Sequence, residues 1–151
     1  MSYSLILAQI KATVESASGI GTVHDYERWA NKHADFETLF KSGSKINGWF
    51  ISREAIQDEW VTQLEILTTY TYVIKGFYSL DDSAASEKTF QALVDAVMNK
   101  LRAKVTYSDT TEKAEPPQAR LIGSLTVFGI ACHYCEIEVS ADERLTITLA
   151  D

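Results

Sequence analysis

Residues 60–78 have the sequence WVTQLEILTTYTYVIKGFY, and their pattern decides the fold class. Valine, isoleucine, threonine and aromatic residues dominate the stretch, which is the composition of a β-strand. Apolar and polar side chains alternate, so a strand would place them on opposite faces of a sheet. One buried face and one wet face are typical of an antiparallel sheet. The predicted buried face carries Leu64, Ile66, Tyr70, Tyr72 and Ile74, and the predicted wet face carries Gln63, Glu65, Thr69, Thr71 and Lys75.

A partner strand is predicted directly before this stretch, over residues 46–53 (INGWFISR). Trp49 and Ile51 would lie on one of its faces, and Ile46 and Phe50 on the other. The polar residues 54–59 (EAIQDE) are expected to connect the two strands. The strands would then pair as a β-hairpin with an exposed tip near residues 55–59.

Two helices of ordinary length are predicted, one on each side of this hairpin in the chain. Apolar residues from Tyr3 to Ala17 recur at steps of three and four, and Gly19 is expected to stop this first helix. Residues 81–83 (DDS) supply capping side chains for the second helix. Its apolar stripe consists of Phe90, Leu93, Val94, Val97, Leu101 and Val105.

The segment from Thr22 to Ser42 is ambiguous. Trp29, His33, Phe36 and Phe40 fit a helical stripe, although Asp35 would also cap a shorter helix. We favour a strand up to about Arg28, a short helix from about Asp35, and a turn at residues 42–44 (SGS).

Three β-like pieces follow a polar loop over residues 108–118. Residues 121–128 and 130–139 are separated by Gly129 alone, which suggests a bend or bulge instead of a hairpin, and residues 144–149 could form a final edge strand. The whole order predicts a single α+β domain over residues 1–151. Its mostly antiparallel or mixed sheet would pack against two main helices on one side, with a projecting β-hairpin.

Composition sets further bounds on function. The chain has 151 residues, of which 46% are hydrophobic, and 14 basic against 21 acidic residues give a net charge of −7. This acidity argues against a dedicated DNA-binding module. The sequence contains no apolar run of membrane-spanning length and no basic leader before residues 5–8, so we expect a protein made and kept in the cytoplasm without membrane contact.

The sequence offers little catalytic chemistry. It has no phosphate loop, dinucleotide fingerprint or nucleophile elbow. Cys132, His133 and Cys135 are too few for structural zinc, and a strand would turn Cys132 and His133 to opposite faces, so we expect reduced thiols, no metal and no cofactor. Glu136 and Glu138 are expected on a solvated face. We predict that the protein is not an enzyme; the alternative is a small enzyme or ligand-binding domain with His133 and Glu136 near its site.

Three tryptophans and seven tyrosines exceed what the core of a small acidic domain needs, and aromatic residues are enriched at protein interfaces. Trp60 stands beside the polar stretch expected at the hairpin tip. Arg53, Glu54, Asp58 and Trp60 are therefore predicted to contact a neighbouring subunit or another partner.

Five segments, taken in order and spacing, resemble the tail-terminator or tail-completion proteins of phages and prophages, including those of the lambda type. The resemblance extends over nearly the whole chain. The segments are residues 19–21 (GIG) after the first helix, 23–29 (VHDYERW), 48–53 (GWFISR), 74–80 (IKGFYSL) before the long helix, and 132–137 (CHYCEI).

This resemblance implies a structural virion protein that assembles into a ring, usually a hexamer, on the head-proximal end of the tail tube. Such a ring ends tube polymerisation and provides the surface that joins tail to head, so the implied partners are the tail tube protein and a head or neck connector protein. DNA would pass through the ring without specific binding, and six copies at −7 each would give about −42. The runner-up within this class is a neck or head-completion protein.

Overall fold

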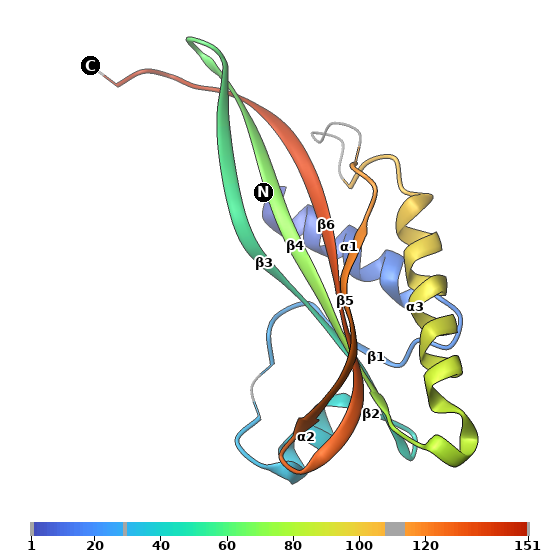
Figure 1. Ribbon diagram of the computed structural model, residues 1–151. Coiled ribbons are helices and arrows are strands. Elements are labelled where there is room, and N and C mark those ends of the chain that lie inside the picture. Colours follow the sequence, from blue (N-terminus) through green and yellow to red (C-terminus); the bar gives the residue numbers. More distant parts are fainter. Residues whose placement is uncertain (1, 29, 108–113, 151) are drawn as a thin grey trace.

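The computed structural model describes residues 2–28, 30–107 and 114–150. These residues form a mixed six-stranded sheet with helices on both faces, so the predicted α+β fold is confirmed (Figure 1). The helices are α1 (Ser2–Glu15), α2 (His33–Phe40) and α3 (Ser86–Arg102), with a short 3-10 helix, η1 (Asp82–Ala84), before α3. The strands are β1 (Thr22–His24), β2 (Lys41–Ser42), β3 (Lys45–Thr62), β4 (Glu65–Ser79), β5 (Gln118–Val127) and β6 (Ile130–Thr146).

The strand order across the sheet is β1-β3-β4-β6-β5, and β2 pairs separately with β3. Only the short β1–β3 pairing is parallel among the described strands; β3–β4, β4–β6 and β5–β6 are antiparallel. Three long strands, β3, β4 and β6, therefore form the centre of the sheet. Their upper ends extend past both α1 and α3 (Figure 1).

The larger core lies between the sheet and the two main helices. Helices α1 and α3 cover one face, which we call the helix face, as the sequence predicted. Trp49, fully buried, is the largest side chain there; its ring stacks on Phe90 of α3 at 6.3 Å, and its Nε1 donates a 3.0 Å hydrogen bond to Asn47 Oδ1. Gly76 of β4 faces this ring with no side chain of its own, which leaves room for the indole.

A second, smaller core lies on the opposite face of the sheet, which we call the open face. Here α2 covers only the lower end, where Phe36 and Phe40 pack against Phe50, Phe77 and other residues. The predicted division of β3 between Trp49 on one face and Phe50 on the other is confirmed. Above α2 the open face has no covering helix within the described part of the chain (Figure 1).

The predicted connection over residues 54–59 is wrong. These residues continue β3 and pair with β4, from Ala55 opposite Thr71 to Glu59 opposite Leu67. The turn of the hairpin lies instead at residues 63–64. The segment resembles a loop in sequence because it covers no core, so nothing selects the apolar alternation that marks a half-buried strand.

The predicted bend at Gly129 is also wrong, because β5 and β6 form a true hairpin. Phe128 and Gly129 both have positive φ, 49° and 79°, as a two-residue type I′ turn requires. A phenylalanine in the left-handed region gives no such signal in sequence. The separate final strand over residues 144–149 is likewise replaced by the end of β6, which runs to Thr146.

Smaller corrections concern element ends. Helix α3 stops at Arg102, and Val105, expected on its apolar stripe, is 63% exposed. Strand β1 ends at His24, before the expected limit near Arg28, and α2 begins two residues before Asp35. The predicted role of Trp29, and most of the polar loop over residues 108–118, lie outside the described residues.

Candidate assembly interface

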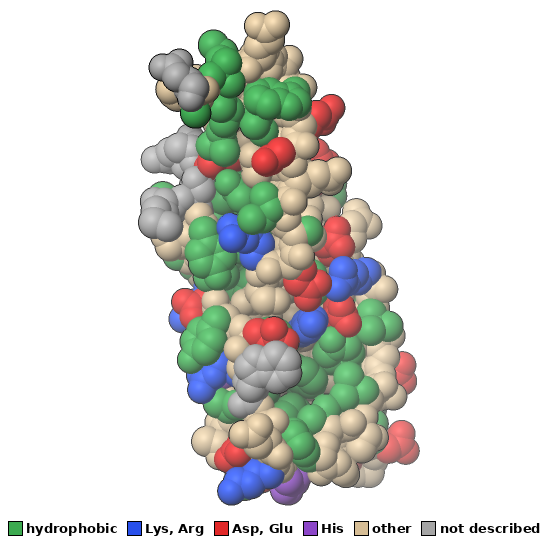
Figure 2. All heavy atoms as spheres, turned by 90° about the vertical axis from the view of Figure 1, so that its left-hand side faces the viewer, with side chains coloured by type: hydrophobic (Ala, Val, Ile, Leu, Met, Phe, Trp, Pro, Cys, Tyr) green, Lys and Arg blue, Asp and Glu red, His purple; other side chains and the backbone are tan. Residues whose placement is uncertain are grey.

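The projecting part of the sheet, which we call the arm, consists of residues 54–69 of the β3–β4 hairpin together with residues 141–149. The latter are the end of β6 and the segment that follows it. Residues 54–62 of β3 are all exposed. Hydrophobic side chains gather at the far end of the arm (Figure 2). Trp60 is 61% exposed and lines a shallow depression with Val61, Thr62, Gln63 and Leu149. An apolar group of this kind at the end of a projection is typical of a contact surface.

The arm is internally ordered by hydrogen bonds between its strands. Thr68 Oγ1 donates to Asp58 Oδ1 at 2.7 Å, and Thr69 Oγ1 donates to Asp142 Oδ1 at 2.8 Å. The backbone of Ile147 also donates to the carbonyl of Leu64 at 2.7 Å, which holds the C-terminal segment against the hairpin turn. These hydrogen bonds fix the strands of the arm and the C-terminal segment relative to one another.

The arm joins the body through an aromatic and basic contact on the helix face. The Arg53 guanidinium lies 4.5 Å from the ring centre of Tyr3 in α1 and 5.6 Å from that of Tyr70. Burial, followed by the charge of Glu143, raises the pKa of Tyr70. Arg53 thus fixes the lower end of the arm to α1.

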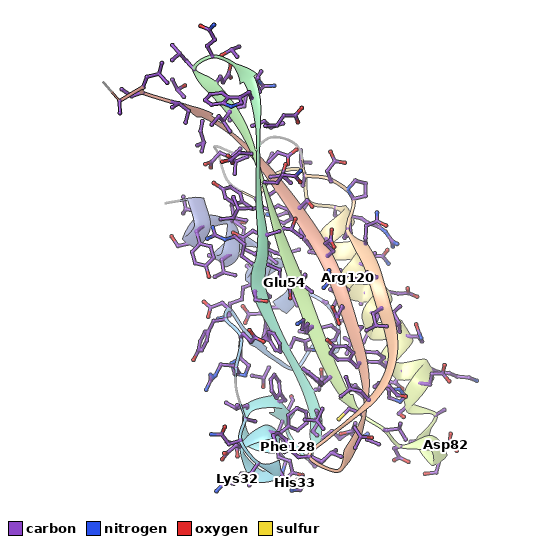
Figure 3. All side chains as sticks on the ribbon, turned by 60° about the vertical axis from the view of Figure 1, so that its left-hand side comes forward. Lys32, His33, Glu54, Asp82, Arg120 and Phe128 are labelled. Carbon is purple, nitrogen blue, oxygen red and sulfur yellow. The ribbon has the colours of Figure 1, made fainter. Side chains whose placement is uncertain are left out.

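On the open face, Glu54 belongs to an ion-pair network. Its carboxylate lies 3.3 Å from Lys75 Nζ and 3.2 Å from Arg120 Nη2 (Figure 3). Arg120 also pairs with Glu136 at 2.8 Å and Glu138 at 3.3 Å. Burial opposes ionisation of Glu136, but hydrogen bonds from Arg120 and Tyr134, together with the positive charges nearby, hold the pKa of Glu136 below its usual value.

The four residues predicted to form one interface therefore lie at three levels of the arm. Arg53 and Glu54 are at its base on opposite faces, Asp58 is in the middle, and Trp60 is near the tip. A β-bulge between Arg53 and Ala55 adds to this separation. Only Trp60 stands in an exposed apolar group; Glu54 and Arg53 are engaged within the chain.

Strand β5 is a second exposed surface, which the sequence analysis did not identify. Leu121 is 47% exposed and Ile122 is 39% exposed, although they point to opposite faces of the sheet. At its end, Phe128 lies on the turn near α2 (Figure 3). Uncovered apolar residues on both faces of one strand could have indicated an edge, but the same pattern also fits a strand buried on both faces.

The histidines and cysteines occupy separate environments. His24 Nε2 hydrogen-bonds the Leu39 carbonyl at 2.7 Å, and His33 lies 3.6 Å from Glu37. Both cysteines are buried, Cys132 under α2 and Cys135 in the main core, so they lie on opposite faces of β6. Within the described ranges, no group of three metal-ligating side chains occurs.

A buried serine–histidine contact joins α3 to β6. Ser86 Oγ lies 2.8 Å from His133 Nε2 and accepts a 2.8 Å hydrogen bond from the backbone of Asp81, while the His133 ring stacks on Phe90. In the part of the chain that the structure describes, no carboxylate hydrogen-bonds to His133. Glu136 lies on the opposite face, away from this contact. The contact links the start of α3 to β6.

No protein-family model matches the chain, and no curated protein is detectably similar to it. No helix among the described residues has both the length and the apolar character needed to cross a membrane.

Proposed function

We propose that this protein is a non-catalytic structural subunit that assembles with copies of itself into a ring, as the tail terminator of a phage or prophage. The observation that carries the proposal is the arm: a β-projection that leaves Trp60 and its apolar neighbours in solvent. An isolated subunit gains nothing from exposing them, whereas an assembled one buries them. The place at the head-proximal end of the tail rests on the sequence resemblance.

The oligomer is tested by the molecular mass of the purified chain over a wide range of concentration. We expect a discrete oligomer that grows with concentration and appears as a ring by electron microscopy. Trp60→Ala should raise the concentration needed for assembly by at least about tenfold without unfolding the subunit, because large aromatic side chains dominate the energies of interfaces. Tyr26→Ala is the matched control, since Tyr26 is 54% exposed but lies outside the arm.

The biological role is tested by tail assembly. Addition of the protein to polymerising tail tubes should produce tails of one length that accept heads, and omission should produce overlong tubes. A protein that stays monomeric at every concentration, or a Trp60→Ala variant that assembles and ends tubes normally, would contradict the proposal. A ring that binds only the head connector, and not the tube, would indicate a neck protein.

A further inference from the structure

Two strand segments on opposite sides of the sheet have free outer edges. In the described residues, β1 pairs with β3 only from Gly48 to Phe50, so β3 has no partner on its outer side along the arm. Strand β5 is the last strand on the other side. The regular free edge of β3 spans residues 55–60 between two bulges, and that of β5 spans residues 121–127 between a bulge and the hairpin turn. The two segments are therefore almost equal in length.

Two of the features by which proteins protect sheet edges, lysine and proline, are missing from both segments. Neither residues 54–62 nor residues 118–127 contain a lysine or a proline. Each also exposes large apolar side chains, Trp60 and Ile56 on the arm and Leu121 and Ile122 on β5. Unpaired backbone donors and acceptors beside exposed apolar side chains form a template for another β-strand.

We infer that the arm segment of β3 in one copy pairs antiparallel with β5 of the next copy, so that the sheet continues from subunit to subunit. A ring of more than two copies needs two different surfaces on each subunit, and the sheet offers one on each side. This inference rests on the proposed homo-oligomer, and it names the surfaces that would build it.

The strand directions favour this pairing over the other edge available. Successive antiparallel pairings from β3 through β4 and β6 make β5 antiparallel to β3. The registers place residues 55–60 level with residues 140–145 of β6, and residues 121–127 level with residues 130–136. The strands must therefore be steeply tilted to the ring axis for the arm to reach the neighbour's β5, and in that arrangement β3 meets β5 antiparallel. The free upper end of β6 would meet β3 parallel, which is the less stable arrangement per residue.

Charge is complementary along the two edges. Residues 54–62 contain three acidic residues and no basic one, whereas residues 118–127 contain one arginine and no acidic residue. No pair of like charges would meet across the junction, whatever the register. Two arm segments paired with each other would instead bring acidic residues together, which disfavours a twofold dimer through β3.

The test is disulfide cross-linking between two single-cysteine proteins in which Cys132 and Cys135 are replaced by alanine. Gln57→Cys, on the open face of the arm, is mixed with a cysteine at each of four β5 positions: Leu121, Ile122, Gly123 and Ser124. Cross-links should form with Leu121→Cys or Gly123→Cys, which face the same side as Gln57, and not with Ile122→Cys or Ser124→Cys. Within one chain β3 and β5 are three strands apart, about 14 Å at the usual spacing, too far for a disulfide.

Each result has a defined meaning. Cross-linking that alternates along β5 and appears only in mixtures supports the inference. A discrete oligomer that lacks this alternation, or Gln57→Cys protein that cross-links to itself, overturns the inference and leaves the proposed function standing. Absence of any oligomer, by mass measured on the same samples, overturns both.

Discussion

Gly76→Ala tests whether Trp49 organises the core as the structure indicates. A β-carbon at Gly76 would overlap the six-membered ring of Trp49 and would lie 2.6 Å from its Cη2, far inside van der Waals contact. The ring has little freedom to move, because it is fully buried, stacked on Phe90 and hydrogen-bonded to Asn47. We therefore expect a loss of stability by overpacking.

The expected loss is about 1–3 kcal/mol, which is typical of an added methyl group in a close-packed core. For a domain of this size, a loss of 1 kcal/mol lowers Tm by about 2–4 °C, so the expected decrease is about 2–12 °C. Thermal and urea unfolding followed by circular dichroism would measure it. Gly123→Ala is the matched control, since nothing lies within 4 Å of its added β-carbon and it also sits in a strand.

A second variant separates packing from backbone effects. Gly76→Ala should lower the free energy of unfolding by less in a Trp49→Phe background, because the smaller ring leaves space for the methyl group. Equal stability of Gly76→Ala and Gly123→Ala would refute the packing argument. The packing argument would also be refuted if Gly76→Ala lowered the free energy of unfolding by the same amount in the Trp49→Phe background as in the wild type.

Three further outcomes are expected. Leu93→Ala should lower the unfolding free energy by about 1–4 kcal/mol, since it leaves a cavity between α3 and the sheet; unchanged thermal stability would contradict a core position. Burial raises the pKa of the Cys132 thiol to about 11 and of the Cys135 thiol to about 12, so a thiol reagent at pH 8 should label neither in the folded protein and both after unfolding. Because the pKa of Glu136 is lowered in the fold, its stabilisation should be fully present above the unfolded pKa of about 4.3 and lost as pH falls through the lower folded value. The Tm difference between wild type and Glu136→Gln should therefore shrink below about pH 4, and a difference that persists at lower pH would rule out this ionic origin.

The sequence predicts this fold well wherever one face of an element covers a core. The alternation in β4 and the stripe on α3 each reflect burial on one side, and the faces assigned from them are confirmed at Tyr72, Ile74 and Leu93. The arm was misassigned as a loop for the same reason, since residues 54–62 face solvent on both sides. The hairpin turn at Phe128 could not be predicted. Phe128 adopts a left-handed backbone conformation there, and only the tertiary structure holds a phenylalanine in that conformation.

The candidate interface could be predicted only in part. The aromatic excess pointed to Trp60, which is 61% exposed near the tip of the arm, and its contact with a partner stays a prediction. The prediction treated four residues close in sequence as one surface, but strand alternation and the bulge after Arg53 distribute them over two faces. The contact of Ser86 with His133 joins residues 47 positions apart, which no local pattern reveals.

The proposed continuous sheet leads to a prediction about DNA. If β3 and β5 join neighbouring copies, one face of the sheet turns to the hole of the ring. Helices α1 and α3 cover the helix face, whereas α2 covers only the lower end of the open face. The larger outer circumference of a ring has room for the thicker layer, so we expect the open face to turn inward. Along the arm and the upper strands this face carries six acidic and three basic residues, a net of −3. They are Glu54, Glu59, Glu65, Glu136, Glu138 and Asp142 against Lys75, Arg120 and Arg144.

Such a lining should let a duplex slide, because neutralisation of phosphates by basic residues supplies most non-specific affinity for DNA. We expect the assembled protein to bind duplex DNA no more tightly than about 10⁻⁴ M at physiological salt. Ser140→Lys, on the open face opposite Thr71, should create binding that weakens steeply as salt is raised. Gln91→Lys, exposed on α3, makes the same change of charge on the outside and should not create it. Tight binding by the unaltered protein, or equal gains from the two lysines, would show that the open face does not line a passive channel, since only charge placed within a Debye length of about 8 Å acts on the DNA.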